Sequence, residues 1–119
     1  MRILICGGRD FTDYDLFLDK MAKFKEILYF PTIIHGGCKG ADMLADRYAK
    51  YNGWELEIYE ADWDKHGKAA GPIRNKLMLE EGKPDLVIAF PGGRGTENMI
   101  NLTKEAGVDL FIVGGKNGK

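Results

Sequence analysis

The chain has 119 residues, of which 45% are hydrophobic, and a formal net charge of −1 at pH 7. This length suits one domain, and the apolar fraction is too high for a disordered chain. The near-neutral charge disfavours a nucleic-acid binder, because such proteins neutralise phosphates with an excess of basic residues, although a near-neutral total is compatible with a local basic patch.

The first half of the chain alternates strands and helices. Residues 3–6 form a continuous apolar run, as a strand buried on both faces requires. Thr12 is the expected N-cap of a helix whose apolar positions continue to Leu28. A short strand is expected at 32–35 and a helix at 41–51, which Asn52 and Gly53 close.

The second half continues the alternation. A strand is expected at 54–59, and Pro72 suits the first turn of a helix that ends near Glu81. Another buried strand follows at 86–90. Thr96 is expected to open a helix that ends near Ala106, and the last strand lies at 110–113.

This order predicts an α/β fold, a single Rossmann-like doubly wound domain with a five-stranded parallel sheet and helices on both faces. The simplest strand order is 3-2-1-4-5, which places a topological switch point between the first and fourth strands. We expect the domain to span residues 1–113 and a flexible tail to span 114–119.

Three glycine-rich loops follow three different strands, at residues 7–11, 36–42 and 91–96. The carboxyl ends of parallel strands share one edge, so the loops can line one crevice, and a helix start with free N–H groups follows each. Missing side chains let a ligand oxygen approach those N–H groups, which favours a phosphate-type ligand over ordinary turns. The loops match neither the dinucleotide fingerprint nor a Walker A motif, and no cluster has zinc spacing.

The segment 61–75 is long for a loop between a strand and a helix. Arg74 is expected in the first turn of the next helix, where a cation opposes the helix dipole and a bound anion would reverse that penalty. The alternative is an exposed arginine that pairs with Asp62 or Asp64. Trp63 either stacks on a base or, as is commoner for a single tryptophan, packs at the edge of the core.

Several other polar residues have two interpretations. Asp42 either orients the loop at 36–40 or holds a ligand hydroxyl. Arg9 and Arg94 either contact phosphate or are solvated loop charges. His35, at a strand end, is interpreted as a hydrogen-bonded structural residue rather than a base, and no histidine can be placed beside Cys38 to make it a nucleophile. Cys6 is expected to be a buried thiol, since two cysteines are too few for a disulfide scaffold.

No run is long enough to span a bilayer, and the N-terminus enters the first strand directly without the pattern of a signal peptide. We therefore expect a cytoplasmic protein with no membrane partner.

The motifs together resemble a known family. Gly-Gly-Arg-Asp-Phe at 7–11, His-Gly-Gly-Cys-Lys-Gly-Ala-Asp at 35–42, Ala-Asp-Trp at 61–63, Gly-Pro-Ile-Arg-Asn at 71–75 and Pro-Gly-Gly-Arg-Gly-Thr at 91–96 resemble the YspA (cpYpsA-related) family of the SLOG superfamily. The resemblance covers nearly the whole chain and implies a Rossmann-like domain, often from a phage or bacterium, that binds a nucleotide or a nucleotide-derived ligand. Relatives include the "lonely guy" phosphoribohydrolases, the DprA DNA-processing proteins and sensors of NAD-derived signals.

The sequence departs from the phosphoribohydrolase pattern at one position. In those enzymes a catalytic Glu follows Pro-Gly-Gly-x-Gly-Thr after two residues, and Met99 stands there in this chain. Glu97 lies two residues early, on another side of the helix. Glu97, Asp42 and Arg74 are therefore only weak catalytic candidates, as is Asp10, and whether the protein is an enzyme stays open.

Three functions are compatible with these features: a sensor or binding module for a nucleotide-derived ligand such as a nucleotide, NAD or ADP-ribose; a phosphoribohydrolase-like N-glycosidase; and a DprA-like DNA binder. The missing Glu favours the first. No metal or further cofactor is implied. We also expect a homodimer or higher homo-oligomer, with Tyr29, Phe30, Tyr48 and Met99 as candidates for an apolar patch; the alternative is that these side chains fill the domain's own core. The expected ligand-binding residues are Gly7, Gly8, Arg9, Asp10, Gly36, Gly37, Lys39, Gly40, Asp42, Trp63, Arg74, Asn75, Pro91, Gly92, Gly93, Arg94, Gly95 and Thr96.

Overall fold

The computed structural model describes residues 1–114, so the expected tail lies, beyond Gly114, outside the described residues. One parallel sheet forms the centre, in the strand order β3-β2-β1-β4-β5 that the alternation predicted. Its strands are β1 (Arg2–Cys6), β2 (Thr32–His35), β3 (Glu55–Ile58), β4 (Leu86–Ala89) and β5 (Asp109–Ile112). The helices are α1 (Tyr14–Met21), α2 (Ala41–Asn52), α3 (Trp63–His66), α4 (Ala70–Gly82) and α5 (Arg94–Ala106), with short 3-10 turns η1 (Ala22–Phe24) and η2 (Gly67–Ala69).

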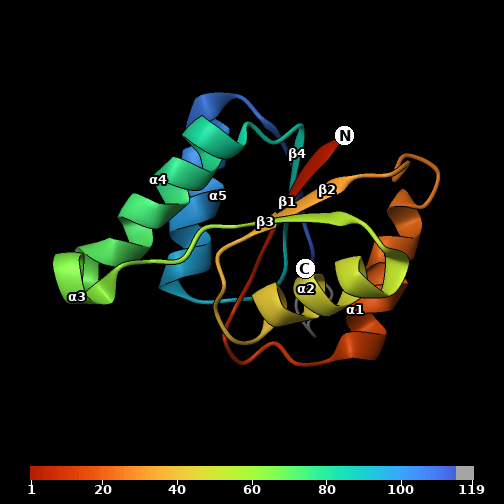
Figure 1. Cartoon of the computed structure of the whole chain (residues 1–119), viewed down its shortest axis with the longest axis horizontal. Helices are drawn as coiled ribbons and strands as arrows, with labels where there is room; N and C mark the ends of the chain where they lie inside the picture. The colour runs from red at the N-terminus through yellow and green to blue at the C-terminus, as the bar shows by residue number, and fades with distance from the viewer. Residues whose placement is uncertain (115–119) are drawn as a thin grey trace.

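Helices cover both faces of the sheet, with α1 and α2 on one side and α4 and α5 on the other (Figure 1). Two apolar clusters fill the space between these layers. Phe17 and Ala45 belong to the cluster under α1 and α2, and Met78 and Met99 to the cluster under α4 and α5. The central strand β1 contributes to both, because successive side chains of a strand point to opposite faces. The continuous apolar run at residues 3–6 is explained by this double burial.

Three helix boundaries differ from expectation. Asp13, not Thr12, caps α1, and its carboxylate accepts a hydrogen bond from Leu16 N at 3.0 Å; Asp is somewhat the stronger N-cap of the two. Helix α5 begins at Arg94, two residues before Thr96, although Gly95 is a poor helix former. Helix α4 begins at Ala70, so Arg74 lies in its second turn, where the dipole penalty is weaker.

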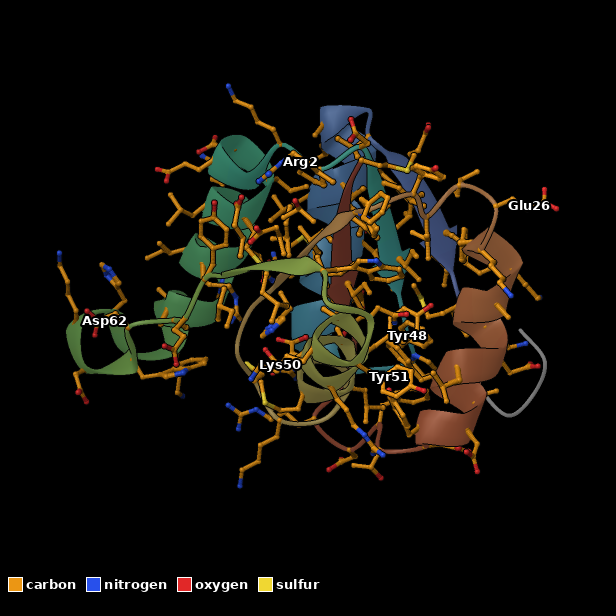
Figure 2. All side chains as sticks on the ribbon, turned by 45° about the vertical axis from the view of Figure 1, so that its right-hand side comes forward. Arg2, Glu26, Tyr48, Lys50, Tyr51 and Asp62 are labelled. Atoms are coloured by element: carbon orange, nitrogen blue, oxygen red, sulfur yellow. The ribbon has the colours of Figure 1, made fainter. Side chains whose placement is uncertain are left out.

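The expected apolar patch for self-association is only partly exposed. Tyr29 and Phe30 are 79% and 80% exposed. Tyr48 instead packs against Phe17 and Trp54, with ring centroids 5.5 and 5.3 Å away, and lies between α2 and α1 (Figure 2). Met99 is fully buried in the core and cannot belong to a surface patch, which corrects that expectation.

Candidate functional site

The three glycine-rich loops meet at the carboxyl edge of the sheet, below the strands in Figure 1. The loop after β1 lies in the middle and is bonded to both others. Gly8 N donates to Pro91 O at 2.8 Å, and Ala41 N donates to Gly8 O at 3.1 Å. An added Cβ at Gly40 would overlap Gly8 O, and one at Gly92 would lie 2.6 Å from Gly8 N. Glycine is therefore required at these positions for the close approach of three backbones.

A cleft of about 870 Å³ opens beside these loops, between them and the segment that carries α3 and the start of α4. This volume is in the range of small-molecule sites. A smaller cavity of about 230 Å³ shares Arg9, Cys38 and Trp63 with it. Expected ligand-binding residues that line the cleft are Gly7, Gly8, Arg9, Asp10, Asp42, Trp63, Arg74, Asn75, Gly93, Arg94, Gly95 and Thr96.

The remaining expected residues lie elsewhere. Gly36, Gly37 and Lys39 line the smaller cavity. Gly40, Pro91 and Gly92 line neither cavity and lie where the loops are packed together.

Four cations surround the cleft, in contrast to the net charge of −1 of the whole chain. Arg9, Lys68, Arg74 and Arg94 line it, against two carboxylates at Asp10 and Asp42. A concave surface lined by one sign of charge concentrates ligands of the opposite sign. The cleft is therefore suited to an anion.

Two glycines at the start of α5 have no packing role within the described residues. Gly93 is the N-cap and Gly95 the second residue of this helix, and a Cβ added to either would meet no atom within 4 Å. Neither has a positive φ. No side chain caps the helix, whose first internal bond runs from Glu97 N to Gly93 O at 3.0 Å. The earlier N–H groups thus lie at an open, glycine-lined surface of the cleft.

Arg74 is held by neutral groups rather than by a carboxylate. Its Nη1 donates to Gly36 O at 2.7 Å and lies 3.6 Å from the Cys38 sulfur, and its Nε donates to Asn75 Oδ1 at 3.0 Å. The alternative ion pair with Asp62 or Asp64 is not formed: Asp62 instead caps α3 through Lys65 N, at the outer end of the molecule (Figure 2). The guanidinium charge remains available at the cleft wall.

Asp42 orients the loop after β2, as one of its two interpretations predicted. Its Oδ2 accepts hydrogen bonds from Gly36 N and Cys38 N at 3.1 and 3.2 Å. The side chain is 6% exposed, and burial raises the pKa of this carboxyl above its ordinary value of 3.8. Burial likewise raises the pKa of the neighbouring Cys6 thiol to about 12, so Cys6 is a neutral group in the cleft wall.

His35 is structural. Its ring is fully buried, its Nδ1 accepts from Gly37 N at 3.0 Å, and its Nε2 lies 2.9 Å from Asp46 Oδ1. Because Nδ1 accepts, the proton is on Nε2 and is donated to Asp46. This arrangement supports the turn at residues 36–37 and keeps the ring out of the cleft.

Trp63 is 47% exposed and lines both cavities, with the Arg9 guanidinium 6.0 Å from its ring centroid. One edge of its ring lies near Gly71 of α4, so only part of the ring packs against the domain. The exposed part presents an aromatic surface to the two cavities.

The position of the missing Glu is outside the cleft. Met99 is fully buried beside Leu4 and Met78, so a carboxylate there would be a charge in an apolar cluster. Glu97 is exposed and does not line the cleft. The carboxylates that do line it are Asp10 and Asp42.

Some lining residues were not expected from the sequence. Asn98 could have been found from its spacing, because it lies one helical turn after Gly95. Cys6 and Met78 carry no such signal, since buried apolar residues look like core. The unexpected lining residues are Cys6, Cys38, Lys68, Gly71, Pro72, Met78 and Asn98.

Within residues 1–114, no three side chains of His, Cys, Asp or Glu gather closely enough to hold a metal ion. Over the same residues, no helix has the length and hydrophobicity needed to cross a membrane.

Comparison with known proteins agrees with the resemblance. Residues 1–66 match the model of the YspA, cpYpsA-related SLOG family. The Gene 61 protein of Mycobacterium phage D29 is 37% identical over an alignment 123 residues long, gaps included, which covers 97% of this chain and 98% of that protein. A solved structure described as a predicted subunit of tRNA methyltransferase from Methanocaldococcus jannaschii is 16% identical, with a TM-score of 0.41, and the match covers 99% of this chain and 72% of that one. The family model and the phage relative together show that this chain belongs to the YspA, cpYpsA-related SLOG family.

Proposed function

We propose that this protein binds a phosphate-bearing, nucleotide-derived small molecule in the cleft and acts as a sensor or binding module. Membership of the SLOG family supports a nucleotide-related binding or modifying module. The main support for a phosphate-bearing ligand is the structure of the start of α5. There, Gly93 and Gly95 face open space beside uncapped N–H groups, in a cleft that four cations line. Such a helix start binds phosphate well.

The rest of the cleft supports a nucleotide over inorganic phosphate. Half-exposed Trp63 provides a surface on which a base can stack, and the cleft has room for more than a phosphate. Arg74 lies on the cleft wall against the loop after β2, where its Nη1 donates to Gly36 O, and brings a guanidinium charge that suits phosphate oxygens.

The rival function is hydrolysis of an N-glycosidic bond. That reaction needs a group that stabilises developing positive charge or activates water. The buried carboxyl of Asp42 accepts hydrogen bonds from Gly36 N and Cys38 N, and Glu97 does not line the cleft, so Asp10 is the cleft carboxylate left for such a role. These contacts favour binding without turnover. The net charge of −1 still disfavours the DNA-binding alternative.

The test combines calorimetry with chromatography. AMP, ADP-ribose and NAD are titrated into the protein, with adenosine as the probe that lacks a phosphate. We expect at least one phosphate-bearing probe to bind at least tenfold more tightly than adenosine, with no release of free base from AMP. Equal binding of adenosine and all three phosphate-bearing probes would contradict a phosphate site, and base release would make the protein an enzyme.

We further propose that the protein works in the cytoplasm as a homo-oligomer. The exposed pair Tyr29 and Phe30 supports self-association, since the two rings lie side by side, with centroids 5.3 Å apart, and contiguous exposed apolar surface marks protein–protein contacts. Light scattering at micromolar concentration tests it, and a monomer mass would overturn it.

A further inference from the structure

Asn98 is a polar cleft-lining residue that neither the family motifs nor the proposed function uses. It lies on α5, one turn after Gly95, and is half-buried. Helical side chains lean toward the N-terminus of their helix. The amide of Asn98 therefore lies over the first turn of α5, beside the open N–H groups.

The orientation of a neighbouring amide is fixed by its surroundings. Asn75 Oδ1 accepts from Arg74 Nε at 3.0 Å, and Asn75 Nδ2 donates to Gly95 O at 3.1 Å. Arg74 Nε can only donate and a carbonyl can only accept. Turning the Asn75 amide over would place donor against donor and acceptor against acceptor, so Asn75 has one orientation.

This orientation determines that of Asn98. The second N–H of Asn75 Nδ2 donates to Asn98 Oδ1 at 2.9 Å. The oxygen of Asn98 is thereby turned toward Asn75, and its Nδ2 is turned away. Within residues 1–114, no acceptor is bonded to Asn98 Nδ2. A side chain that could present either a donor or an acceptor is held as a donor.

We propose that Asn98 Nδ2 donates to an oxygen of the phosphate group bound at the start of α5, and so makes the site specific for a group that only accepts hydrogen bonds. This inference rests on the proposed function. The nearby N–H groups of Gly95 and Thr96 are also donors, so an oxygen that needs to donate finds no partner among them. The chain Arg74–Asn75–Asn98 is the positioning device.

The test is Asn98→Asp, which changes one N–H2 group into oxygen. The variant keeps an oxygen for Asn75 Nδ2, so we expect it to unfold at the wild-type temperature. Its charge would oppose a phosphate, so we expect AMP affinity to fall at least tenfold and adenosine affinity to stay unchanged. Asn101→Asp is the control, because it makes the same change on the same helix at an exposed position that does not line the cleft.

A second variant removes the donor without adding charge. Asn98→Ala should weaken AMP binding roughly three- to tenfold, the loss of one hydrogen bond. Wild-type AMP affinity in Asn98→Asp would overturn the assignment. So would equal losses for AMP and adenosine together with a lower unfolding temperature, which would mark Asn98 as structural. If the wild-type protein binds none of the phosphate-bearing probes, the proposed function fails and this assignment fails with it.

Discussion

Two glycine-rich loops that look alike in the sequence have different roles in the fold. We call residues 36–40 the β2 loop and residues 91–95 the β4 loop. In the β2 loop, an added Cβ at Gly36 or Gly40 would overlap Arg74 or Gly8 O, and one at Gly37 would lie 2.9 Å from Glu60 Cγ. Gly37 and Gly40 also have positive φ angles, and Gly36 leaves room for the Arg74 guanidinium, so all three glycines serve contacts within the chain.

In the β4 loop, Gly92 alone packs against the loop after β1. Gly93 and Gly95 are exposed and meet nothing within 4 Å. A glycine in a helix interior lowers stability relative to Ala by roughly 0.5–1 kcal/mol. Its presence at position 95 has no explanation in the packing of the described residues, whereas a ligand at this surface would explain it. The comparison separates glycines that build the site from glycines that leave room in it.

The largest effect is expected in the β2 loop. Gly40 has a φ of +77°, and Gly40→Ala would force a methyl group onto Gly8 O, so we expect a loss of about 3 kcal/mol in the free energy of unfolding or no folded protein. Gly53→Ala is the control for a positive φ without a close neighbour, with a φ of +71° and no atom within 4 Å; its ψ of 28° lies in the left-handed helical region, whereas the ψ of Gly40 is −130°. It should lose only about 1–2 kcal/mol, the cost of the left-handed backbone. Urea denaturation measures both, and equal losses would contradict a packing role for Gly40.

Asp42 gives the next largest effect. Asp42→Ala leaves Gly36 N and Cys38 N without their acceptor, which should lower the free energy of unfolding by about 2–3 kcal/mol. Asp42→Asn should retain most of that stability, because one oxygen accepts both bonds. If Asn is as damaging as Ala, the loop depends on the charge rather than on the hydrogen bonds.

The comparison of wild type with Asp42→Asn also predicts how the free energy of unfolding depends on pH. The pKa of Asp42 is raised in the folded protein, so its protonated carboxyl stabilises the fold. This stabilisation is fully present below the ordinary pKa of 3.8 and is lost as the pH rises through the folded-state pKa. Wild type should therefore lose stability relative to Asp42→Asn as the pH rises from below 3.8 toward neutrality. Unfolding curves over that range test the sign, and a difference that moves the other way contradicts it.

Arg74 bonds to the β2 loop and, through Asn75, is linked to the β4 loop, and its removal is expected to affect ligand binding more than folding. Arg74→Ala should weaken AMP binding by about 1.5–3 kcal/mol, the range for a charge-assisted hydrogen bond. The control is Arg47→Ala, an exposed arginine over Tyr14 that lies outside the cleft. Calorimetry and thermal unfolding should be run on both variants. An AMP affinity that Arg74→Ala leaves unchanged would remove this residue from the site.

The smallest effect is expected in the β4 loop. Gly95→Ala should raise the free energy of unfolding by about 0.5–1 kcal/mol, since Ala is the better helix former and has room. AMP affinity should fall, because the methyl group occupies the surface where the phosphate is proposed to lie. A stabilised variant with undiminished AMP binding would show that the bound AMP does not occupy the surface at Gly95.

The pattern of the sequence alone determined the fold class, the strand order and the edge at which the site lies. The reason is that a run such as residues 3–6 can be buried on both faces only in the middle of a parallel sheet, and the carboxyl ends of such strands then share an edge. The resemblance to the family rested largely on loops at that edge, two of which, at residues 7–11 and 36–42, lie within the residues 1–66 that the family model matches. The starts of α1 and α5 were predicted less exactly, because the choice of capping residue shifts a helix start by only one or two positions, which the apolar pattern does not resolve.

Only the tertiary structure decided which residues of these loops face the cleft. The sequence shows Gly40 and Gly95 as the same residue type in similar loops, but contacts with Gly8, far away in the chain, separate them. Met99 was expected at the surface and lies in the core, and Asn98, next to it, lines the cleft. Adjacent positions of a helix point about 100° apart, so the docking of α5 on the sheet determines which of them is buried.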